Sequence, residues 1–239
     1  MLSRIAVLAA ALTLGCAGVA RAETDVGLFA GALAGVHEGA DNPSLSGLGA
    51  GALLEITQHW NGGRLHLEGI PRVTASGSGT AAFGRSTVAL SILNATVSQD
   101  LDRHGRVRAG VGFQLINISN YNGNNGDRNY ARVTSPRFEI AAKLPTAHNR
   151  FVGATLAVMP NVRGVLHAVD VTNTPEIDRP ERGAEVDYAL TYGWEGPRVT
   201  YVAGIRGLSY HTRNVITGGL VDRNVGGGLT FEAQFHLGR

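Results

Sequence analysis

Histidines and aspartates close to predicted strand ends are the residues in this sequence whose types could perform acid–base chemistry. Two pairs are candidates, His37 with Asp222 and His211 with Asp170, because a carboxylate can orient a histidine that acts as a general base. No nucleophile motif accompanies them, since the sequence has no Gly-x-Ser-x-Gly, no His-Glu-x-x-His and no phosphate-binding loop. We therefore expect a protein that is not an enzyme, and a hydrolase with its active site at these strand ends is the alternative.

Metal, cofactor and nucleic-acid binding find little support in the composition. The 8 histidines are scattered without the spacing of metal ligands, and the single cysteine is Cys16. The formal net charge is +2, from 21 basic and 19 acidic residues, and no basic run offers an electrostatic footprint for nucleic acid. We expect no metal, no cofactor and no nucleic-acid partner.

Residues 1–22 have the pattern of a secretory signal peptide. A basic start at Arg4 is followed by an apolar core, and Ala20-Arg21-Ala22 matches a cleavage site of the Ala-x-Ala type. Cleavage there would leave residues 23–239, with 19 basic and 19 acidic side chains and no cysteine. Two alternatives stay open, a lipid carried by Cys16 and a retained membrane anchor.

The last stretch, 225–237, shows the pattern that the rest of the chain repeats. Leu229 and Phe231 fall on one face and Thr230 and Glu232 on the other, the period-two alternation of a strand with one apolar and one polar face. The stretch exceeds the roughly five to six residues of an average strand and satisfies the roughly nine to eleven of a tilted membrane-spanning strand. About ten segments alternate in this way: 26–36, 48–60, 65–75, 86–101, 107–120, 132–144, 151–167, 184–195, 199–210 and 225–237.

The connections between these segments are alternately long and short, and both tryptophans lie beside short ones. Trp60 and Trp194 both lie on apolar faces beside short turns, and aromatic residues collect in this way at membrane interfaces. Over nearly all of residues 23–239 this pattern resembles the outer-membrane β-barrel proteins of Gram-negative bacteria. The long polar connections are 38–46, 76–84, 120–129, 171–183 and 212–223, and the short turns lie near Gly62, His104, Thr146 and Gly196.

The resemblance implies an all-β fold, a single-chain antiparallel up-and-down transmembrane barrel of about ten strands with long outer loops and short periplasmic turns. It implies an outer-membrane location, a structural or surface-interaction role through the loops, and as partners outer-membrane lipid, the barrel-assembly machinery and an extracellular ligand at the loops. The omptin proteases also have ten strands, with acid–histidine chemistry at the outer rim, which keeps the hydrolase alternative open. A secreted β-sandwich is the soluble alternative, but the apolar faces of all its strands would have to share one core.

The faces opposite the apolar ones would line the lumen of such a barrel, which is roughly 20 Å across between backbones for ten strands. Unpaired charges are costly in so narrow a space, so we predict a charge-paired network across the lumen, as structural packing. A narrow porin-like channel lined by arginine and glutamate is the alternative. The network is predicted from Glu55, Glu68, Arg72, Arg108, Arg137, Glu139, Lys143, Glu185, Asp187, Arg206 and Glu232, beside a wall of glycines at 27, 31, 35, 47, 49, 51, 226 and 228.

The alternation is interrupted at a few positions. Pro71 cannot donate to a strand ladder, so we expect a bulge or bend there. Apolar residues change face near Ile92 and near Arg206, which predicts a bulge at the first and a register slip at the second. Unbroken alternation in 151–167 would direct Arg163 into the lumen.

Overall fold

The computed structural model describes residues 24–39, 42–78, 85–122, 128–146, 148–169 and 177–237, and in parts of the strands, 29–53 and 70–88 among them, the backbone but not the side chains. Ten strands in these residues form a closed barrel in which each strand pairs antiparallel with its neighbour in the chain and β1 pairs with β10. The predicted fold is thereby confirmed. The strands are β1 (Thr24–Gly39), β2 (Asn42–Trp60), β3 (Gly63–Ser78), β4 (Arg85–Asp100), β5 (Val107–Asn122), β6 (Arg128–Pro145), β7 (Arg150–Val169), β8 (Ile177–Glu195), β9 (Val199–Asn214) and β10 (Leu220–Leu237).

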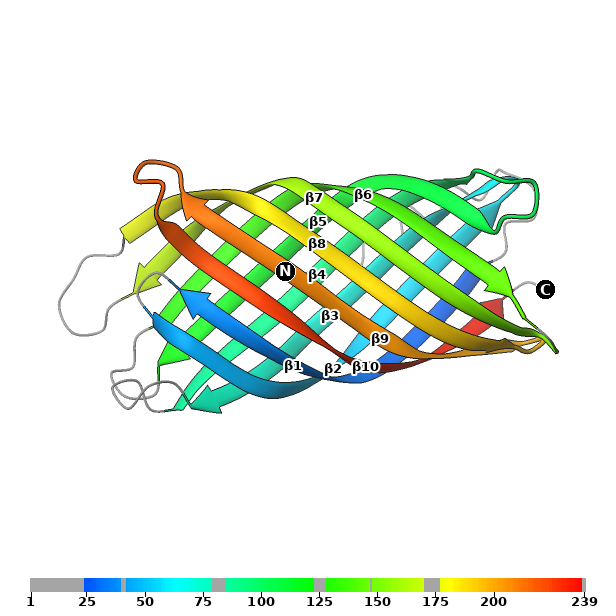
Figure 1. Ribbon diagram of the computed structural model, residues 1–239, viewed down its shortest axis with the longest axis horizontal. Helices are drawn as coiled ribbons and strands as arrows, with labels where there is room; N and C mark the ends of the chain where they lie inside the picture. The colour runs from blue at the N-terminus through cyan, green and yellow to red at the C-terminus, as the bar shows by residue number, and fades with distance from the viewer. Residues whose placement is uncertain are drawn as a thin grey trace.

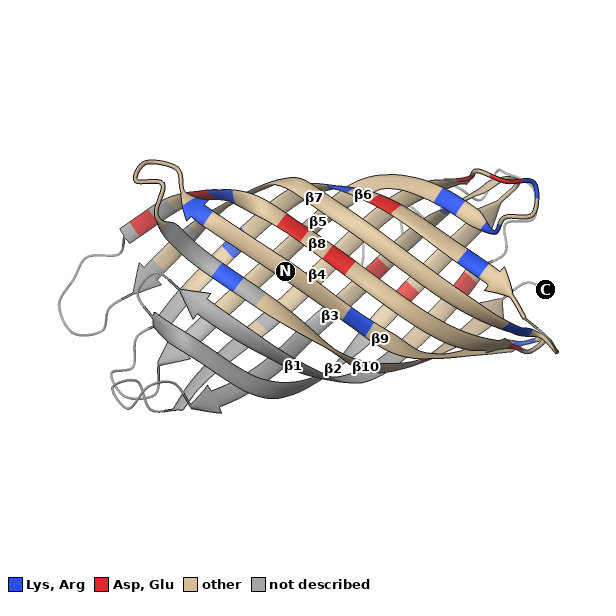
Figure 2. Cartoon of the chain, viewed as in Figure 1, with Lys and Arg blue, Asp and Glu red and all other residues tan. Residues whose placement is uncertain are grey.

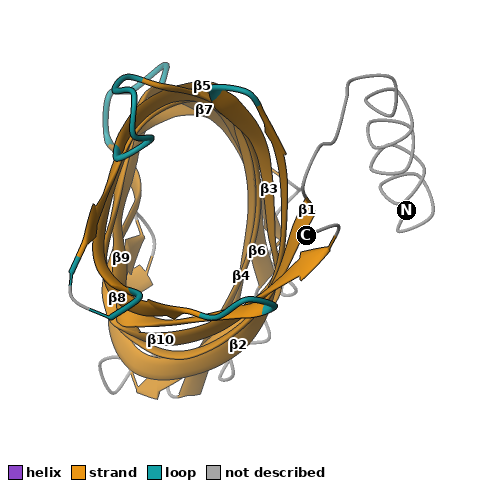
Figure 3. Ribbon diagram, turned by 90° about the vertical axis from the view of Figure 1, so that its right-hand side faces the viewer, coloured by secondary structure: helices purple, strands orange, loops and turns teal. Residues whose placement is uncertain are grey.

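The strands are steeply tilted and run the full length of the barrel (Figure 1), and the end-on view shows a single closed ring of strands (Figure 3). All except β4 are longer than the sequence pattern predicts, and the strands range from 16 residues in β1 to 20 in β7. Because a membrane crossing needs only about nine to eleven residues, the wall continues beyond the bilayer. The extension takes up much of the predicted outer connections, so that β8 begins at Ile177 and β10 at Leu220.

The outside of the barrel is apolar. Side chains such as Val111, Leu229 and Phe231 are exposed by 60%, 62% and 65%, although all three are hydrophobic. An exposed apolar surface on this scale marks a surface that faces lipid. The soluble β-sandwich is wrong, because the described strands close on one another and direct these side chains outward.

The two tryptophans lie at the end of the barrel that carries the short turns. Trp60 is the last residue of β2 and Trp194 the last but one of β8, and both are exposed. The Trp194 ring stacks on Tyr201 with 6.0 Å between ring centroids. Thr24 and Leu237, which pair at the start of β1 and the end of β10, belong to the same end. In outer-membrane barrels this end is periplasmic.

Two bulges in the middle of the wall lie at prolines, and the register also shifts near the outer ends of β1 and β10, between His37 and Gly39 and between Leu220 and Asp222. The expected bulge at Pro71 is confirmed, because the registers of β3 with both neighbours shift between Ala50/Leu54 and Ile70/Val73. A second bulge, which the alternation does not predict, lies in β7 at Pro160, where the register with β8 shifts between Met159 and Val162. A one-residue slip reverses the faces of a strand. Val162 is therefore buried inside and Arg163 is exposed outside, so the expectation of an inward Arg163 is wrong.

The two other predicted irregularities are also wrong. β4 pairs with β5 without a register shift, so there is no bulge at Ile92, which is 8% exposed and faces inward opposite Ile116. β9 keeps its register with β8 and β10 through Arg206, and Tyr210 beyond it is 1% exposed. The physical reason is common to both. Apolar residues that look misplaced for a polar lumen belong to an apolar cluster inside the barrel.

Candidate functional site: the barrel interior

The centre of the interior holds an ion pair between distant strands. Arg206 of β9 donates to Glu68 of β3, and three strands of the closed ring lie between them. His66 lies between two carboxylates, with its Nδ1 3.4 Å from Glu55 Oε1 and its Nε2 3.8 Å from Glu68 Oε2. Asn94 of β4 donates a further hydrogen bond of 3.3 Å to Glu68. Glu68 thus connects two walls of the barrel.

A second group joins β6 to its surroundings at a similar height. Arg137 Nη1 lies 2.5 Å from Asp187 Oδ2 on β8, and its Nη2 lies 3.1 Å from Glu139 Oε2. Arg64 of β3 approaches Glu139 to 3.9 Å, and Gln114 of β5 donates to Asp187 over 3.5 Å. These side chains have at most about a fifth of their surface exposed. Acidic and basic groups therefore alternate across the interior, and Figure 2 shows charged residues along the middle of the strands as well as at their ends.

The remaining residues of the predicted network have separate surroundings. Lys143 pairs with Glu195 at the turn end and lies 4.3 Å from the centroid of the Phe151 ring. Glu232 accepts a hydrogen bond of 2.6 Å from Gln234. Glu185 is buried, at 1% exposure, and Arg108 is partly buried, with a buried Nε that has no hydrogen-bond partner among the described residues. The side chain of Arg72 lies outside the described residues.

Because Gly27 has no side chain, two carboxylates fit beside it at the barrel seam, where β1 pairs with β10. A Cβ at Gly27 on β1 would lie 3.1 Å from Glu232 Oε1 and 3.1 Å from Glu55 Cβ. The two glutamates come from β10 and β2 and meet in front of β1. The register continues the glycine wall along these strands, where Gly35 lies opposite both Gly226 and Gly47.

Above this polar layer, toward the outer end, lies an apolar layer that the sequence pattern does not predict. Met159 and Val162 of β7 are completely buried, Val133 is 1% exposed, and Tyr210 enters the same cluster from β9. Ile92 belongs to β4, which lies opposite β9 in the ring. The cluster therefore extends along the inside of the wall from β4 to β7 and includes Tyr210 of β9. One acidic side chain lies at the same height, because buried Glu185 of β8 pairs with both Met159 and Tyr210 in the register. The cluster consists of Ile92, Ile116, Ile118, Ala131, Val133, Ala157, Met159, Val162 and Tyr210, with Leu208 packed against it.

A chain of hydrogen bonds closes the barrel seam at the turn end. The two carboxylate oxygens of Asp25 on β1 contact two imidazoles: Oδ2 lies 2.9 Å from His59 Nε2 on β2, and Oδ1 lies 2.6 Å from His236 Nδ1 on β10. The other ring nitrogen of His236, Nε2, lies 2.9 Å from Thr200 Oγ1 on β9. The order acid, imidazole, hydroxyl is that of a nucleophilic triad. Thr200 is only 2% exposed, however, so no substrate reaches its hydroxyl in this conformation. The arrangement instead connects four consecutive strands, including the first and the last.

Of the two His–Asp pairs suggested as hydrolase candidates, His37 with Asp222 and His211 with Asp170, the structure describes only the side chain of His211. His211 is exposed and faces outward, since its neighbour Thr212 is completely buried inside. Asp170 and the side chains of His37 and Asp222 lie outside the described residues. Another histidine contact lies on the outer surface, where His167 pairs with Asp178 and stacks on Tyr130 with 4.6 Å between ring centroids.

Several interior residues lie outside the predicted charge network, namely Asp25, His59, Arg64, His66, Gln114 and His236. All of them occupy the polar face of an alternating strand, so alternation alone could have identified them as inward. Their partners come from strands far apart in sequence, and that information is contained in the closure of the barrel.

The described part of the chain has neither a metal-binding cluster nor a membrane-spanning helix. It contains no group of three or more His, Cys, Asp or Glu side chains arranged to hold a metal ion. Within the same residues no helix is both long and apolar enough to cross a membrane.

Comparison with known proteins identifies the fold. The outer-membrane protease OmpT from Escherichia coli shares 10% sequence identity and a TM-score of 0.62, over 92% of this chain and 98% of that chain. The translocator domain of the autotransporter NalP from Neisseria meningitidis shares 9% identity over 95% and 93% of the two chains, with a TM-score of 0.46. No family model and no curated protein matches the sequence. The chain has the fold of Gram-negative outer-membrane barrels and, with its apolar outer face, is an outer-membrane β-barrel.

Proposed function

We propose that this barrel does not conduct and serves the cell envelope through its outer end, in a structural or surface-interaction role. The observation that carries this proposal is the cluster of buried apolar side chains around Met159, to which β4, β5, β6, β7 and β9 contribute. An ion entering this layer would lose hydration, which costs far more than thermal energy unless protein groups replace the water. The register places the buried carboxyl of Glu185 at this height, beside the apolar side chains of Met159 and Tyr210. The ion pairs below the layer hold the walls at fixed spacing.

The outer end offers an ordered surface for contacts. Between β9 and β10, Asn214 Oδ1 accepts hydrogen bonds from the amides of Ile216 at 2.8 Å and Thr217 at 3.0 Å. Gly218 has a φ of 70°, and its amide donates to the Asn214 carbonyl. This turn presents Ile216 with 82% of its surface exposed. An apolar side chain held out on a hydrogen-bonded turn is suited to contact with a partner outside the cell.

A narrow pore is the second candidate, and buried polar atoms favour it. Arg108 Nε, Asn94 Oδ1 and Thr96 Oγ1 have no hydrogen-bond partner among the described residues. Buried polar groups of this kind are usually satisfied by water. Water in the half of the interior near the turns would give a vestibule. Both carboxyl oxygens of Glu185, at the height of Met159, also have no hydrogen-bond partner among the described residues, and a pore would form if the side chains around Met159 moved apart.

Cysteine accessibility distinguishes the two candidates. In a Cys16→Ser background we would introduce Met159→Cys, or Ile216→Cys as the exposed control, and treat proteoliposomes with a small membrane-impermeant maleimide from either side. A closed barrel predicts labelling of the position 216 variant and none of the position 159 variant in the folded state. Rapid labelling at position 159 from either side would support the pore and contradict our proposal. Heat-dependent gel mobility identifies the folded fraction.

A further inference from the structure

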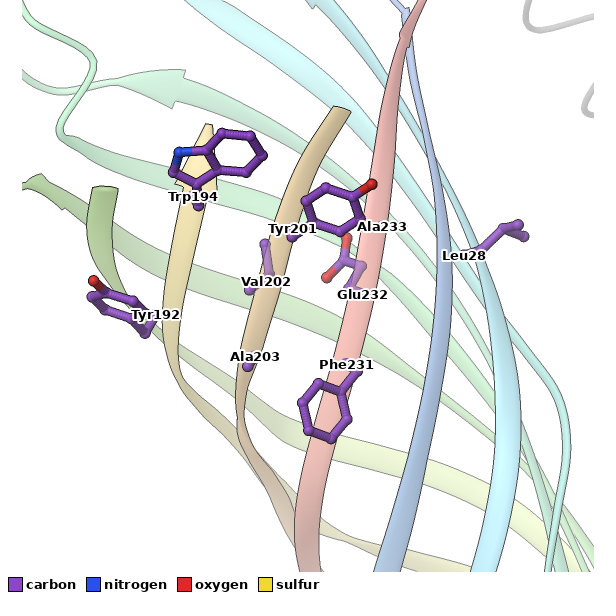
Figure 4. A pocket seen from close by; sticks show the side chains of 9 residues that line it. All are labelled: Leu28, Tyr192, Trp194, Tyr201, Val202, Ala203, Phe231, Glu232 and Ala233. Atoms are coloured by element: carbon purple, nitrogen blue, oxygen red, sulfur yellow. The ribbon is translucent and has the colours of Figure 1, made fainter. Parts of the chain in front are cut away.

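The outer wall of the barrel near the turn end is hollowed by a groove of about 430 Å³. A groove of this size falls within the roughly 300–1,000 Å³ of small-molecule sites. It extends over β8, β9, β10 and β1, and its walls are the outward side chains of Trp194, Tyr201, Phe231 and Leu28, as Figure 4 shows. These four side chains are exposed by 47% to 65%.

The shape of the groove follows from the strand register. Tyr201 lies opposite Ala233, and Ala203 lies opposite Phe231, so large and small residues alternate on β9 and β10. The two alanines form the floor between the aromatic rings. Trp194, stacked on Tyr201, closes the groove toward the turns. Aromatic side chains have few rotatable bonds, so the walls keep their shape without an occupant.

Basic residues lie at the end of the groove that faces the membrane interface. Exposed Arg198 belongs to the turn between β8 and β9, and its carbonyl accepts the amide of His236 on β10 at 2.9 Å. Exposed Arg150 lies opposite Trp194 in the register of β7 with β8, on the outward face. Two cationic residues thus occupy positions next to the aromatic end of the groove, on the neighbouring strand and in the adjoining turn, at the level where lipid headgroups lie.

We propose that this groove binds a phospholipid of the periplasmic leaflet, with an acyl chain on the alanine floor and the phosphate at Arg198 and Arg150. Lipid surrounds this face, so the hydrophobic effect gives no preference for the groove over bulk lipid. The preference arises from packing, because an acyl chain that fills a rigid groove gains contacts that an empty groove would forfeit. Charge complementarity between arginine and phosphate selects a phospholipid over a neutral lipid. This inference is independent of whether the interior conducts.

The chain has 2 tryptophans, and they provide a reporter and a matched control. In Trp60→Phe protein Trp194 is the remaining indole fluorophore, and in Trp194→Phe protein it is Trp60, which lies outside the groove. Each variant of the full chain, folded in neutral detergent, would be titrated with phosphatidylglycerol carrying brominated acyl chains, which quench indole fluorescence on contact. We expect Trp194 to be quenched at a several-fold lower lipid concentration than Trp60.

Further variants localise the effect. Ala233→Leu fills the floor and should raise the lipid concentration for half-quenching of Trp194 to that of Trp60, whereas Ala154→Leu, exposed on β7, should leave it unchanged. Arg198→Gln should remove the preference for brominated phosphatidylglycerol over a brominated neutral diacylglycerol. Equal quenching of the two tryptophans, or no effect of Ala233→Leu in protein with the normal heat-dependent gel shift, would overturn the proposal. Weaker quenching of Trp194 than of Trp60 would also overturn it.

Discussion

Arg206 on β9 donates a hydrogen bond to Glu68 on β3, across the interior of the barrel, between residues separated by 138 positions in the sequence. Alternation directs both side chains inward, and closure of the ring brings them together. The pair lies just below the apolar layer and fixes the distance between two walls. Together the pair and the layer form the closed interior on which the proposed function depends.

Removing one partner of this pair should destabilise the barrel. Arg206→Ala leaves Glu68, whose side chain is 10% exposed, without its cation, and we expect a loss of about 3 kcal/mol in the free energy of unfolding. The value belongs at the lower end of the range for buried pairs, because the Arg206 side chain is 29% exposed. Urea unfolding in detergent, followed by heat-dependent gel mobility, measures the change. Arg132→Ala, at an exposed outward position on β6, is the control and should cost about 0.5 kcal/mol or less. A loss equal to that of the control would show that the ion pair contributes nothing.

Adding a methyl group at the seam should also be unfavourable. The Cβ of Gly27→Ala would lie 3.1 Å from atoms of both Glu55 and Glu232, so at least one glutamate must move. We expect a loss of about 1–3 kcal/mol, as for other overpacked sites. Gly219→Ala, where the nearest atom is Thr217 Oγ1 at 3.5 Å, is the control in the same unfolding assay. Equal stability of the two variants would contradict the role assigned to Gly27.

Truncation inside the apolar layer should be far more costly than truncation outside the barrel. Met159→Ala removes a completely buried side chain and should cost about 2–5 kcal/mol. Ile205→Ala removes a side chain that is 50% exposed to lipid, and lipid can fill the space that it leaves. We expect unfolding midpoints in urea to separate the two variants clearly. Similar midpoints would mean that the interior is hydrated at the height of Met159.

A turn at the periplasmic end provides a prediction on pH. The Val107 amide donates a hydrogen bond of 2.8 Å to Asp102, which holds the pKa of this carboxyl below its usual range. Its contribution to stability is therefore present above the unfolded pKa of about 3.9 and is lost as the pH falls through the folded pKa. NMR titration should give a pKa for Asp102 lower than that of the same residue in unfolded protein. Asp102→Asn should lose stability at neutral pH and match the wild type at the acidic end. A normal pKa for Asp102 would contradict the hydrogen bond.

The sequence predicts the barrel well, because strand alternation is a local property that each strand displays independently. It predicts the contents of the interior less well. Ile92, Leu208 and Tyr210 look like register errors when the lumen is taken to be polar, and only the closed ring shows that they belong to one apolar cluster. Arg163 shows a different limit, since the bulge at Pro160 reverses the faces of β7 and proline alone does not reveal on which side the extra residue is inserted. Alternation directs the side chains of His66 and Arg64 into the lumen. It does not identify their partners, because these contacts join strands that are not all consecutive in the chain.

Ion conductance tests the closed interior most directly. Wild-type protein, with folding verified by the shift between boiled and unboiled samples on a gel, would be inserted into planar bilayers at increasing voltage. We predict a silent bilayer for folded protein, because the buried side chains around Met159 and Tyr210 obstruct the interior. Discrete conductance steps from wild-type protein would contradict this account and would identify the barrel as a narrow pore.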